Sequence, residues 1–262
     1  MTDANKHTAS STDQRPRGAP PSDSPPPLEG IFVVDKPLGM SSFGVVARVR
    51  RAAGRAKTGH AGTLDPLASG VLVLAVGKAT RAISQLMDTD KQYRTEIDLS
   101  AFTTTDDREG ERAEIAVPSP PTDDAVRAAL ATFVGVVQQR PPAFSAMKVD
   151  GERAYRLARA GAPPDLPPRP VRIDRVELLR YEWPIVEIAI ACGKGTYIRS
   201  IARDLGIALG TGGHCATLRR TAVGPFDDRS ALQLDRLPNM LTQAELIPTA
   251  RAIEMVAASR RL

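Results

Sequence analysis

Five runs of apolar residues along the chain predict β-strands. Residues 30–37 and 71–76 are short, continuous apolar runs, a pattern that is typical of strands buried on both faces. Residues 91–99 alternate between apolar and polar positions, which predicts a strand with one buried face. Residues 171–182 and 185–192 follow as two further strand patterns. The folded part of the chain is therefore predicted to contain a β-sheet.

Helical periodicity fills the segments between these strands. Either Ser41 or Ser42 can cap a helix that runs to about Ala53, with its valines on one face. Thr122 can cap another helix that ends near Phe133. Further helical patterns lie at residues 79–87, at residues 152–160 and after Thr196. The valine face of the first helix predicts that it packs on the sheet.

Two segments differ from this regular pattern. Residues 1–29 are rich in Ser, Thr and Pro and poor in apolar residues, so we expect a disordered tail. Residues from about 140 to 170 form an irregular excursion with several arginines between its Pro- and Gly-rich ends. Such an excursion in a compact domain is usually functional or disordered, although a plain surface hairpin is the simpler alternative.

Composition narrows the class of protein. Hydrophobic residues make up 42% of the chain, which supports a globular protein, and the net charge of +5 suits a polyanionic partner. The two cysteines, Cys192 and Cys215, form no CxxC pair, so a disulfide framework and a cysteine-rich zinc site are disfavoured. No long apolar run predicts a membrane span, and no signal peptide is recognisable, so we expect a cytoplasmic protein.

The segment at residues 59–70 is organised like a functional loop. Its glycines allow close backbone approach to a ligand, and Pro66 holds the preceding Asp65 in an extended or turn conformation. A carboxylate is thereby presented on a loop that leads into the predicted strand 71–76. From spacing alone, the favoured interpretation is that Asp65 is a turn residue that binds its own backbone.

Three other groups of residues carry possible chemistry. The basic residues of the helix near residues 48–57 fit either a solvated surface or contacts to phosphates. The Gly-Lys-Gly-Thr sequence at residues 193–196 hints at phosphate binding, but it lacks the glycine spacing of a Walker loop. His214 and Cys215 suggest a metal site or a thiol nucleophile, and two adjacent residues alone make a poor ligand set.

Several motifs together resemble bacterial tRNA pseudouridine synthases of the TruB type. The similarity covers about residues 30–226, and its motifs occur in the family order. They are the segments at residues 35–42, 59–70, 91–93, 138–148, 194–199 and 212–226. The resemblance implies an α+β pseudouridine-synthase fold: a mixed, mainly antiparallel sheet flanked by helices, with a thumb insertion at about residues 140–170.

The same resemblance implies an isomerase that converts uridine 55 in the T-loop of tRNA to pseudouridine. Asp65 would be the catalytic carboxylate, acting on C1′ or C6 or removing the C2′ proton in a glycal route. The sequence leaves these three routes open. No metal or organic cofactor is implied. The expected partner is the T-arm of tRNA, and we expect a monomer.

The resemblance also implies roles for five further residues, all of them in substrate binding. His60 would fill the space left by the flipped base, and Tyr93 would stack on that base. Arg199 would pair with Asp65 and fix its direction, a role for which a guanidinium is physically suited. Tyr197 and Leu218 would line the pocket.

Domain organisation follows from the extent of the match. We expect a disordered tail at residues 1–29, a catalytic domain at residues 30–226 and a short helical segment at residues 227–262. A full RNA-binding domain of the PUA kind, common in the family, is apparently absent. Two alternatives to catalysis on tRNA stay open: a non-catalytic tRNA-binding folding helper, and a remote hydrolase hypothesis that uses His214 and Cys215.

Overall fold

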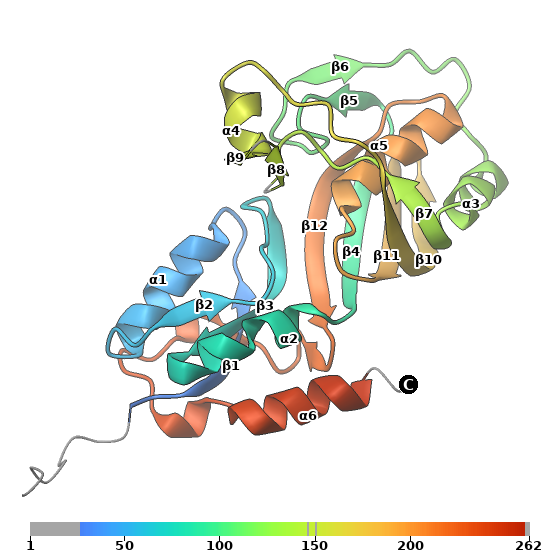
Figure 1. The fold of residues 1–262 in the computed structure, drawn as a ribbon. Coiled ribbons are helices and arrows are strands. Elements are labelled where there is room, and N and C mark those ends of the chain that lie inside the picture. Colours follow the sequence, from blue (N-terminus) through green and yellow to red (C-terminus); the bar gives the residue numbers. More distant parts are fainter. Residues whose placement is uncertain (1–26, 146, 150, 260–262) are drawn as a thin grey trace, which may run out of the picture.

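The computed structural model describes residues 27–145, 147–149 and 151–259. The predicted tail at residues 1–29 lies almost entirely outside these residues. The described chain is built around one ten-stranded mixed sheet, with most neighbouring strands antiparallel (Figure 1). This arrangement confirms the expected α+β class with a mixed, mainly antiparallel sheet flanked by helices.

The sheet is ordered β14-β1-β3-β12-β4-β11-β10-β7, with β2 beside β3 and β13 beside β12. Its strands are β1 (Gly30–Lys36), β2 (Thr58–His60), β3 (Ala68–Val76), β4 (Lys91–Asp98), β7 (Gly135–Gln139), β10 (Arg169–Glu182), β11 (Ile185–Cys192), β12 (His214–Val223), β13 (Phe226–Asp227) and β14 (Leu232–Gln233). Two separate two-stranded sheets are β5 (Ala101–Thr103) with β6 (Arg112–Glu114), and β8 (Lys148–Val149) with β9 (Glu152–Arg153).

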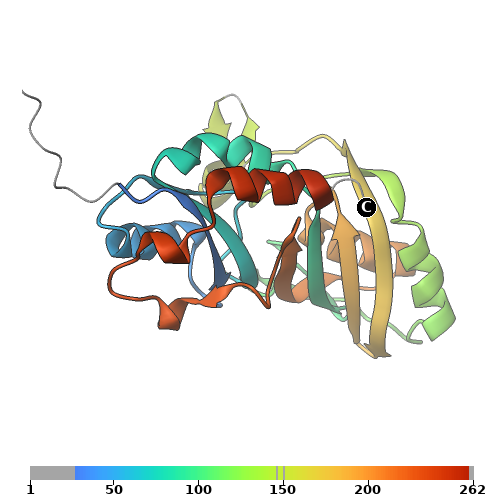
Figure 2. The same ribbon diagram turned by 90° about the horizontal axis from the view of Figure 1, so that it is seen from below.

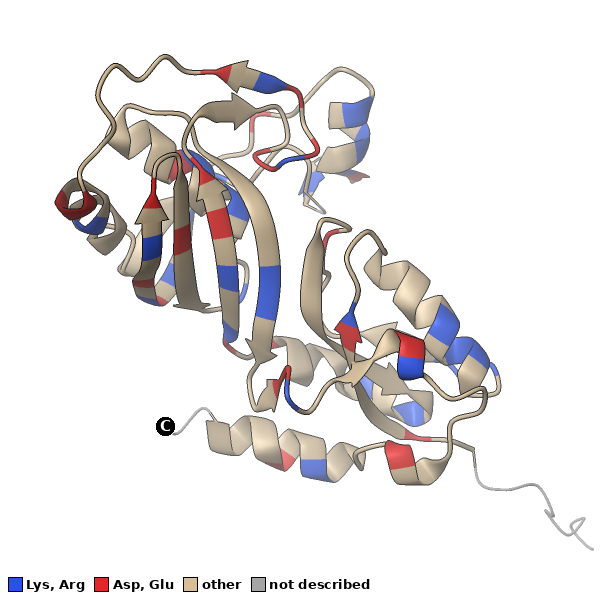
Figure 3. Cartoon of the chain, turned by 180° about the vertical axis from the view of Figure 1, so that it is seen from behind, with Lys and Arg blue, Asp and Glu red and all other residues tan. Residues whose placement is uncertain are grey.

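Helices flank the sheet on both faces in one half of the molecule and on one face in the other (Figure 3). The α-helices are α1 (Ser42–Ala52), α2 (Ile83–Met87), α3 (Asp123–Ala131), α4 (Ala154–Arg159), α5 (Ile198–Leu209) and α6 (Thr249–Ser259). Three 3₁₀ helices are η1 (Gly77–Ala82), η2 (Leu234–Arg236) and η3 (Gln243–Glu245). In the part of the chain that the structure describes, no helix is long and apolar enough to cross a membrane.

The molecule has two halves, which meet where β3 runs beside β12 (Figure 1). One half contains β1 to β3 with α1, α2 and α6, and the other contains β4, β7 and β10 to β12 with α3 and α5. The junction is a short parallel pairing in which Leu218, Arg219 and Arg220 lie opposite residues 68–70. The segment before β3 therefore lies at the boundary between the halves.

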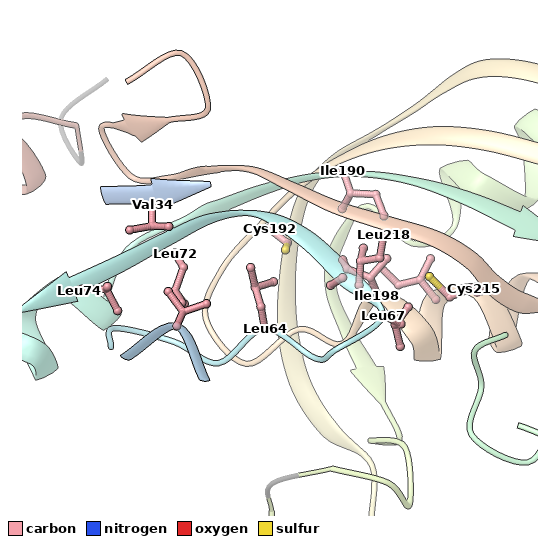
Figure 4. Close-up of a cluster of buried hydrophobic side chains, with 14 of the residues drawn as sticks. Val34, Leu64, Leu67, Leu72, Leu74, Ile190, Cys192, Ile198, Cys215 and Leu218 are labelled. Carbon is pink, nitrogen blue, oxygen red and sulfur yellow. The ribbon is translucent and has the colours of Figure 1, made fainter. Parts of the chain in front are cut away.

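The first half owes its stability to strands that are buried on both faces. Alternate residues of β1 and β3 pack on α1 on one side and on η1, α2 and α6 on the other. Val34, Leu72 and Leu74 belong to the first of these clusters, which continues to Leu218 in the second half (Figure 4). Figure 2 shows α6 and α2 side by side beneath β1. Two-sided burial explains why these strands are continuous apolar runs.

Most local predictions from the sequence are confirmed. Ser41 is the cap of α1, since its hydroxyl accepts a hydrogen bond from the amide of Gly44. Thr122 caps α3 in the same way. The alternation in β4 buries Thr95 and Ile97, as expected, and it also buries Lys91. Residues 79–87 fold as a 3₁₀ helix followed by one turn of α-helix, instead of a single helix.

Candidate active site

Asp65 lies on the loop between β2 and β3, and several contacts hold that loop. The hydroxyl of Ser42, at the start of α1, accepts a hydrogen bond from the amide of Leu64 and donates one to its carbonyl, both at 2.8 Å. The amide of Gly39 donates to the carbonyl of Pro66 at 2.8 Å. Asp65 thus lies between two residues whose backbone is tied to α1 and the segment before it.

Arg220 of β12 fixes the loop from the other side. Its side chain is buried and donates to the carbonyl of Val71 at 2.8 Å and to those of Gly62 and Thr63 at 3.2 and 3.4 Å. Gly70 has φ +104°, and a Cβ there would lie 2.1 Å from the Arg220 carbonyl oxygen. The close approach of β3 to β12 therefore requires glycine at position 70.

The Asp65 carboxylate points at Arg199, which comes from the first turn of α5. The Oδ2 atom of Asp65 lies 2.9 Å from Nη2 of Arg199. The Arg199 side chain is 5% exposed, whereas that of Asp65 is 39% exposed. A buried guanidinium thus fixes the direction of a carboxylate whose free face is open to a ligand.

A second carboxylate lies behind the same arginine. Asp107 places Oδ2 3.2 Å from Nη1 of Arg199, and its side chain is 4% exposed. Its other oxygen accepts hydrogen bonds from the Thr105 hydroxyl at 2.6 Å and the Glu109 amide at 3.0 Å. Arg199 also donates to the carbonyls of Thr105 and Phe144. Each Nη atom of Arg199 thus has two acceptors, which fixes the orientation of the guanidinium and with it that of Asp65.

A pocket of about 280 Å³ opens in front of Asp65 and draws on both halves of the molecule. Among the predicted site residues, Asp65, Tyr93, Tyr197, Arg199 and Leu218 all line it, and Lys91, Ser145 and Arg220 complete its polar wall. His60 does not line the pocket: it ends β2, opposite Leu74 of β3. The structure therefore brings five of the six predicted residues together.

Tyr197 and Tyr93 are held in different ways. The backbone of Tyr197 is clamped by the side-chain amide of Gln139, which donates to its carbonyl and accepts from its amide at 3.1 and 2.8 Å. The guanidinium of Arg169 lies 5.4 Å from the centre of the Tyr197 ring. Tyr93 stands on β4, and burial raises the pKa of its phenol. Both rings are thus positioned by the sheet around the pocket.

Buried cations surround the pocket with few acids to balance them. Burial lowers the pKa of Lys91 from 10.5 to about 8, and its ammonium donates to the carbonyls of Met87 and Thr89. Burial likewise lowers the pKa of Lys36 to about 8, although the charge of Asp65 opposes the shift. Burial and then the charge of Arg220 lower the pKa of His60, whose imidazole is therefore neutral near pH 7.

His214 and Cys215 lie on β12 but not in the pocket. The Nδ1 atom of His214 is 2.9 Å from the carbonyl oxygen of Ala101. Burial raises the pKa of the Cys215 thiol to about 12, so the thiol stays protonated and is a poor nucleophile. Within the described residues, no group of three or more His, Cys, Asp or Glu side chains is placed to hold a metal ion. The geometry therefore gives no support to a hydrolase centred on these two residues.

Three residues that build this site were not singled out from the sequence. Asp107 lies in a loop that reads only as polar, 92 positions before its partner Arg199. Arg220 and Lys91 lie on strands where charged residues normally face solvent. The sequence does contain one indication that Lys91 is buried, because Lys91 lies on the same face of the predicted strand β4 as its apolar residues. The burial of Arg220 depends on contacts with residues about 150 positions away.

Comparison with known proteins covers most of the described chain. Residues 50–198 match the model of the N-terminal domain of TruB family pseudouridylate synthases, and residues 199–253 match that of the tRNA pseudouridylate synthase B C-terminal domain. A protein named tRNA pseudouridine synthase B from Gluconobacter oxydans is 51% identical over 213 residues, which cover 80% of this chain. A protein of that name from an Arthrobacter species is 47% identical over 232 residues, covering 86% of this chain.

Solved structures agree with these sequence matches. A chain in the crystal structure of a Cbf5-Nop10-Gar1 complex superposes with a TM-score of 0.67 at 29% identity, covering 86% of this chain and 62% of that one. A chain of an archaeal box H/ACA sRNP Nop10-Cbf5 complex gives a TM-score of 0.65 at 28% identity, covering 91% and 66%. The present chain spans 63% of the length of the Gluconobacter relative and 76% of the Arthrobacter one.

Proposed function

Since the chain belongs to the TruB family of pseudouridylate synthases, we propose that it isomerises uridine to pseudouridine in tRNA. The proposed target is uridine 55 in the T-loop, and the proposed partner is therefore the T-arm of tRNA. The observation that carries this proposal is the pocket in which one half-exposed carboxylate, Asp65, is fixed by the buried Arg199. We take the active species to be a monomer.

The proposed reaction rearranges atoms within one nucleotide. The bond from C1′ to N1 breaks, the uracil turns, and C5 joins C1′; C5 loses a proton and N1 gains one, so the reaction is balanced without an oxidant or an energy source. Asp65 can attack C1′ or C6, or it can take the C2′ proton in a glycal route. Each route requires an ionised carboxylate against the nucleoside, away from bulk water.

The remaining pocket residues are suited to binding a flipped base. Extruding a uridine from its stack costs about a few kcal/mol, which stacking on Tyr93 would offset. Tyr197 and Leu218 would close the pocket around the uracil, since both line it. We assign His60 to the space that the base vacates, because it lies beside the pocket on the strand that precedes the Asp65 loop.

The proposed division of the chain follows the site. The catalytic domain spans residues 30–226, with a thumb at about residues 140–170 that includes β8, β9 and α4. The described part of that thumb carries Arg153, Arg156 and Arg159, which suit contacts to an RNA backbone. Residues 227–262 form the third segment, whose described part includes β14 and α6.

The experiment that tests the function is tritium release from a tRNA transcript labelled at C5 of uridine. Wild-type protein should release tritium, and the Asp65→Asn variant should release none while still binding tRNA. Release by both proteins would disprove the role of Asp65. If neither protein releases tritium and both bind tRNA, the non-catalytic folding helper is the correct description.

A further inference from the structure

In one stretch of the first half of the molecule, basic residues far outnumber acidic ones. Between Lys36 and Met87 the chain contains eight lysines and arginines and one acidic residue, Asp65. Five of the basic residues lie on α1 or directly after it: Arg48, Arg50, Arg51, Arg55 and Lys57. We call these five the α1 basic surface. All five are exposed.

The α1 basic surface has no side-chain partner among the described residues. None of its five side chains makes a hydrogen bond, an ion pair or a ring contact with the residues that the structure describes. Several arginines of the second half behave differently, since Arg94, Arg112 and Arg180 each contact at least one carboxylate. Figure 3 shows that α1 carries blue segments and no red ones. Unbalanced charge of one sign attracts a polyanion.

The backbone at the end of α1 supports a role for one of these side chains. Arg55 has φ +65°, a left-handed conformation that is uncommon for a residue with a Cβ, and it directly follows Gly54 at φ +61°. Glycine would take this conformation without steric cost. An arginine in this strained position, with its side chain exposed and unpaired, suggests that the side chain has a function outside the folded chain.

The position of α1 relative to Asp65 is fixed. Ser42 at its start is bonded to Leu64, the neighbour of Asp65. With a rise of about 1.5 Å per residue, Arg48 and Arg51 lie roughly 9 and 14 Å further along the helix axis. The exposed Phe43 (79%) lies between Ser42 and these cations. An exposed apolar ring near the start of α1, followed by arginines along the helix, suits a nucleotide chain that leaves the pocket.

We propose that the α1 basic surface binds the phosphate backbone of the RNA stem that adjoins the loop bearing the target uridine. This inference rests on the proposed function, because it takes the pocket to hold a uridine of a structured RNA. The contacts are to phosphates, so they position the stem without reading its sequence. The surface adds to the pocket a second contact that fixes how the RNA enters.

The test compares two triple variants that lose the same charge. In the first, Arg48→Gln, Arg51→Gln and Arg55→Gly remove three cations of the α1 basic surface, and glycine fits the left-handed position. In the control, Arg127→Gln, Arg175→Gln and Arg251→Gln remove three exposed arginines, each of which has a nearby carboxylate. Dissociation constants are measured by fluorescence anisotropy over a range of salt concentrations.

Two RNAs are used, a T-arm hairpin with its full stem and the same loop closed by a shortened stem. For the full hairpin, the α1 variant should bind about tenfold more weakly than the control, and the slope of log Kd against log salt should fall by about two to three. With the shortened stem the two variants should bind alike. Equal affinities and slopes on the full hairpin would overturn the inference, and so would a deficit that persists unchanged with the short stem.

The binding experiment and the tritium-release experiment can fail independently of each other. Tritium release by wild-type protein tests the isomerase, whereas the binding comparison tests the surface. If wild-type protein releases tritium and the two triple variants bind the full hairpin equally, the function stands and the inference fails. If tritium release is absent and the α1 variant binds weakly with a reduced salt slope, the surface stands and the isomerase fails.

Discussion

Arg199 in the pocket and Arg180 on the outer strands each contact more than one carboxylate, yet they differ in what those contacts contribute. Arg180 on β10 lies 3.3 to 3.6 Å from Glu96, Glu182 and Glu187, and its side chain is 50% exposed. Arg199 contacts two carboxylates at 2.9 and 3.2 Å with 5% exposure. Water screens the first group, whereas it is largely excluded from Arg199 and Asp107. Burial, and not the number of ion pairs, therefore decides which group fixes the structure.

The largest effect should come from removing the buried arginine. Arg199→Ala leaves Asp107 charged and without its cation inside the protein, so the free energy of unfolding should fall by about 3 to 5 kcal/mol. Urea denaturation followed by circular dichroism measures this change. A loss below about 1 kcal/mol would show that water reaches Asp107 and that the pocket network is not buried in solution.

The next largest effect should be a lower catalytic rate in a variant of Asp107. Asp107→Asn keeps the shape of the side chain but removes the charge behind Arg199, so Asp65 is held less firmly. A hydrogen bond to a charged group contributes about 1.5 to 3 kcal/mol, which corresponds to roughly a 10- to 100-fold lower single-turnover rate of tritium release.

Asp106→Asn is the matched control for that experiment. Asp106 is the sequence neighbour of Asp107 and pairs with Arg203 at 2.8 Å, an arginine with no contact to Asp65. Asparagine also tolerates the left-handed backbone at this position (φ 60°). Equal rates for the two variants would mean that Asp107 acts only through stability.

The buried ammonium of Lys91 contacts no carboxylate of the described residues, so it should make the stability of the protein depend on pH. The pKa of Lys91 is about 8 in the folded protein and 10.5 otherwise, so between these values the unfolded chain binds the additional proton. Folded protein is then favoured as pH rises, by up to about 3 kcal/mol from this group. The stability of wild type minus that of Lys91→Met should therefore increase from pH 8 to 10.5 and be constant below pH 8.

Lys36 is present in both proteins of that comparison, so its similar pKa cancels in the difference. A difference that stays flat across the whole pH range would place the ammonium of Lys91 in contact with solvent. Thermal or urea unfolding at a series of pH values supplies the data.

The smallest effect should come from Arg180. Arg180→Ala should lower the free energy of unfolding by no more than about 1 kcal/mol, because exposed ion pairs are weak. Raising the salt concentration should reduce even that difference by screening. A salt-independent loss comparable to that of Arg199→Ala would remove the distinction between the two regions.

The sequence predicted this fold where a pattern is local. The alternation in β4 and the capping residues Ser41 and Thr122 depend only on neighbours within a few positions, and the structure confirms them. The strands β2 and β14 were missed because three and two residues are too short to show a period. Both exist because longer strands, β3 and β1, offer them backbone hydrogen bonds.

Only those site residues that belong to a recognisable family motif could be predicted from the sequence. Asp65, Tyr93, Tyr197, Arg199 and Leu218 were named from a family resemblance, and the structure places all five around one pocket. Asp107 had no such signal, because its importance arises from a contact with a residue 92 positions away. Lys36 read in isolation is a surface charge, yet its side chain is fully buried. Long-range contacts of this kind leave no trace in local composition.

The edge of the sheet at β1 has a consequence for synthesis of the protein. Val34 and Asp35 pair with Leu232 and Gln233, and the backbone of Ile31 exchanges two hydrogen bonds with that of Ile247. During translation, β1 leaves the ribosome some 200 residues before these partners exist. Its apolar edge must stay open, or be shielded by a chaperone, for most of that time. The half that carries the Asp65 loop therefore completes its fold only when the last described residues have been made.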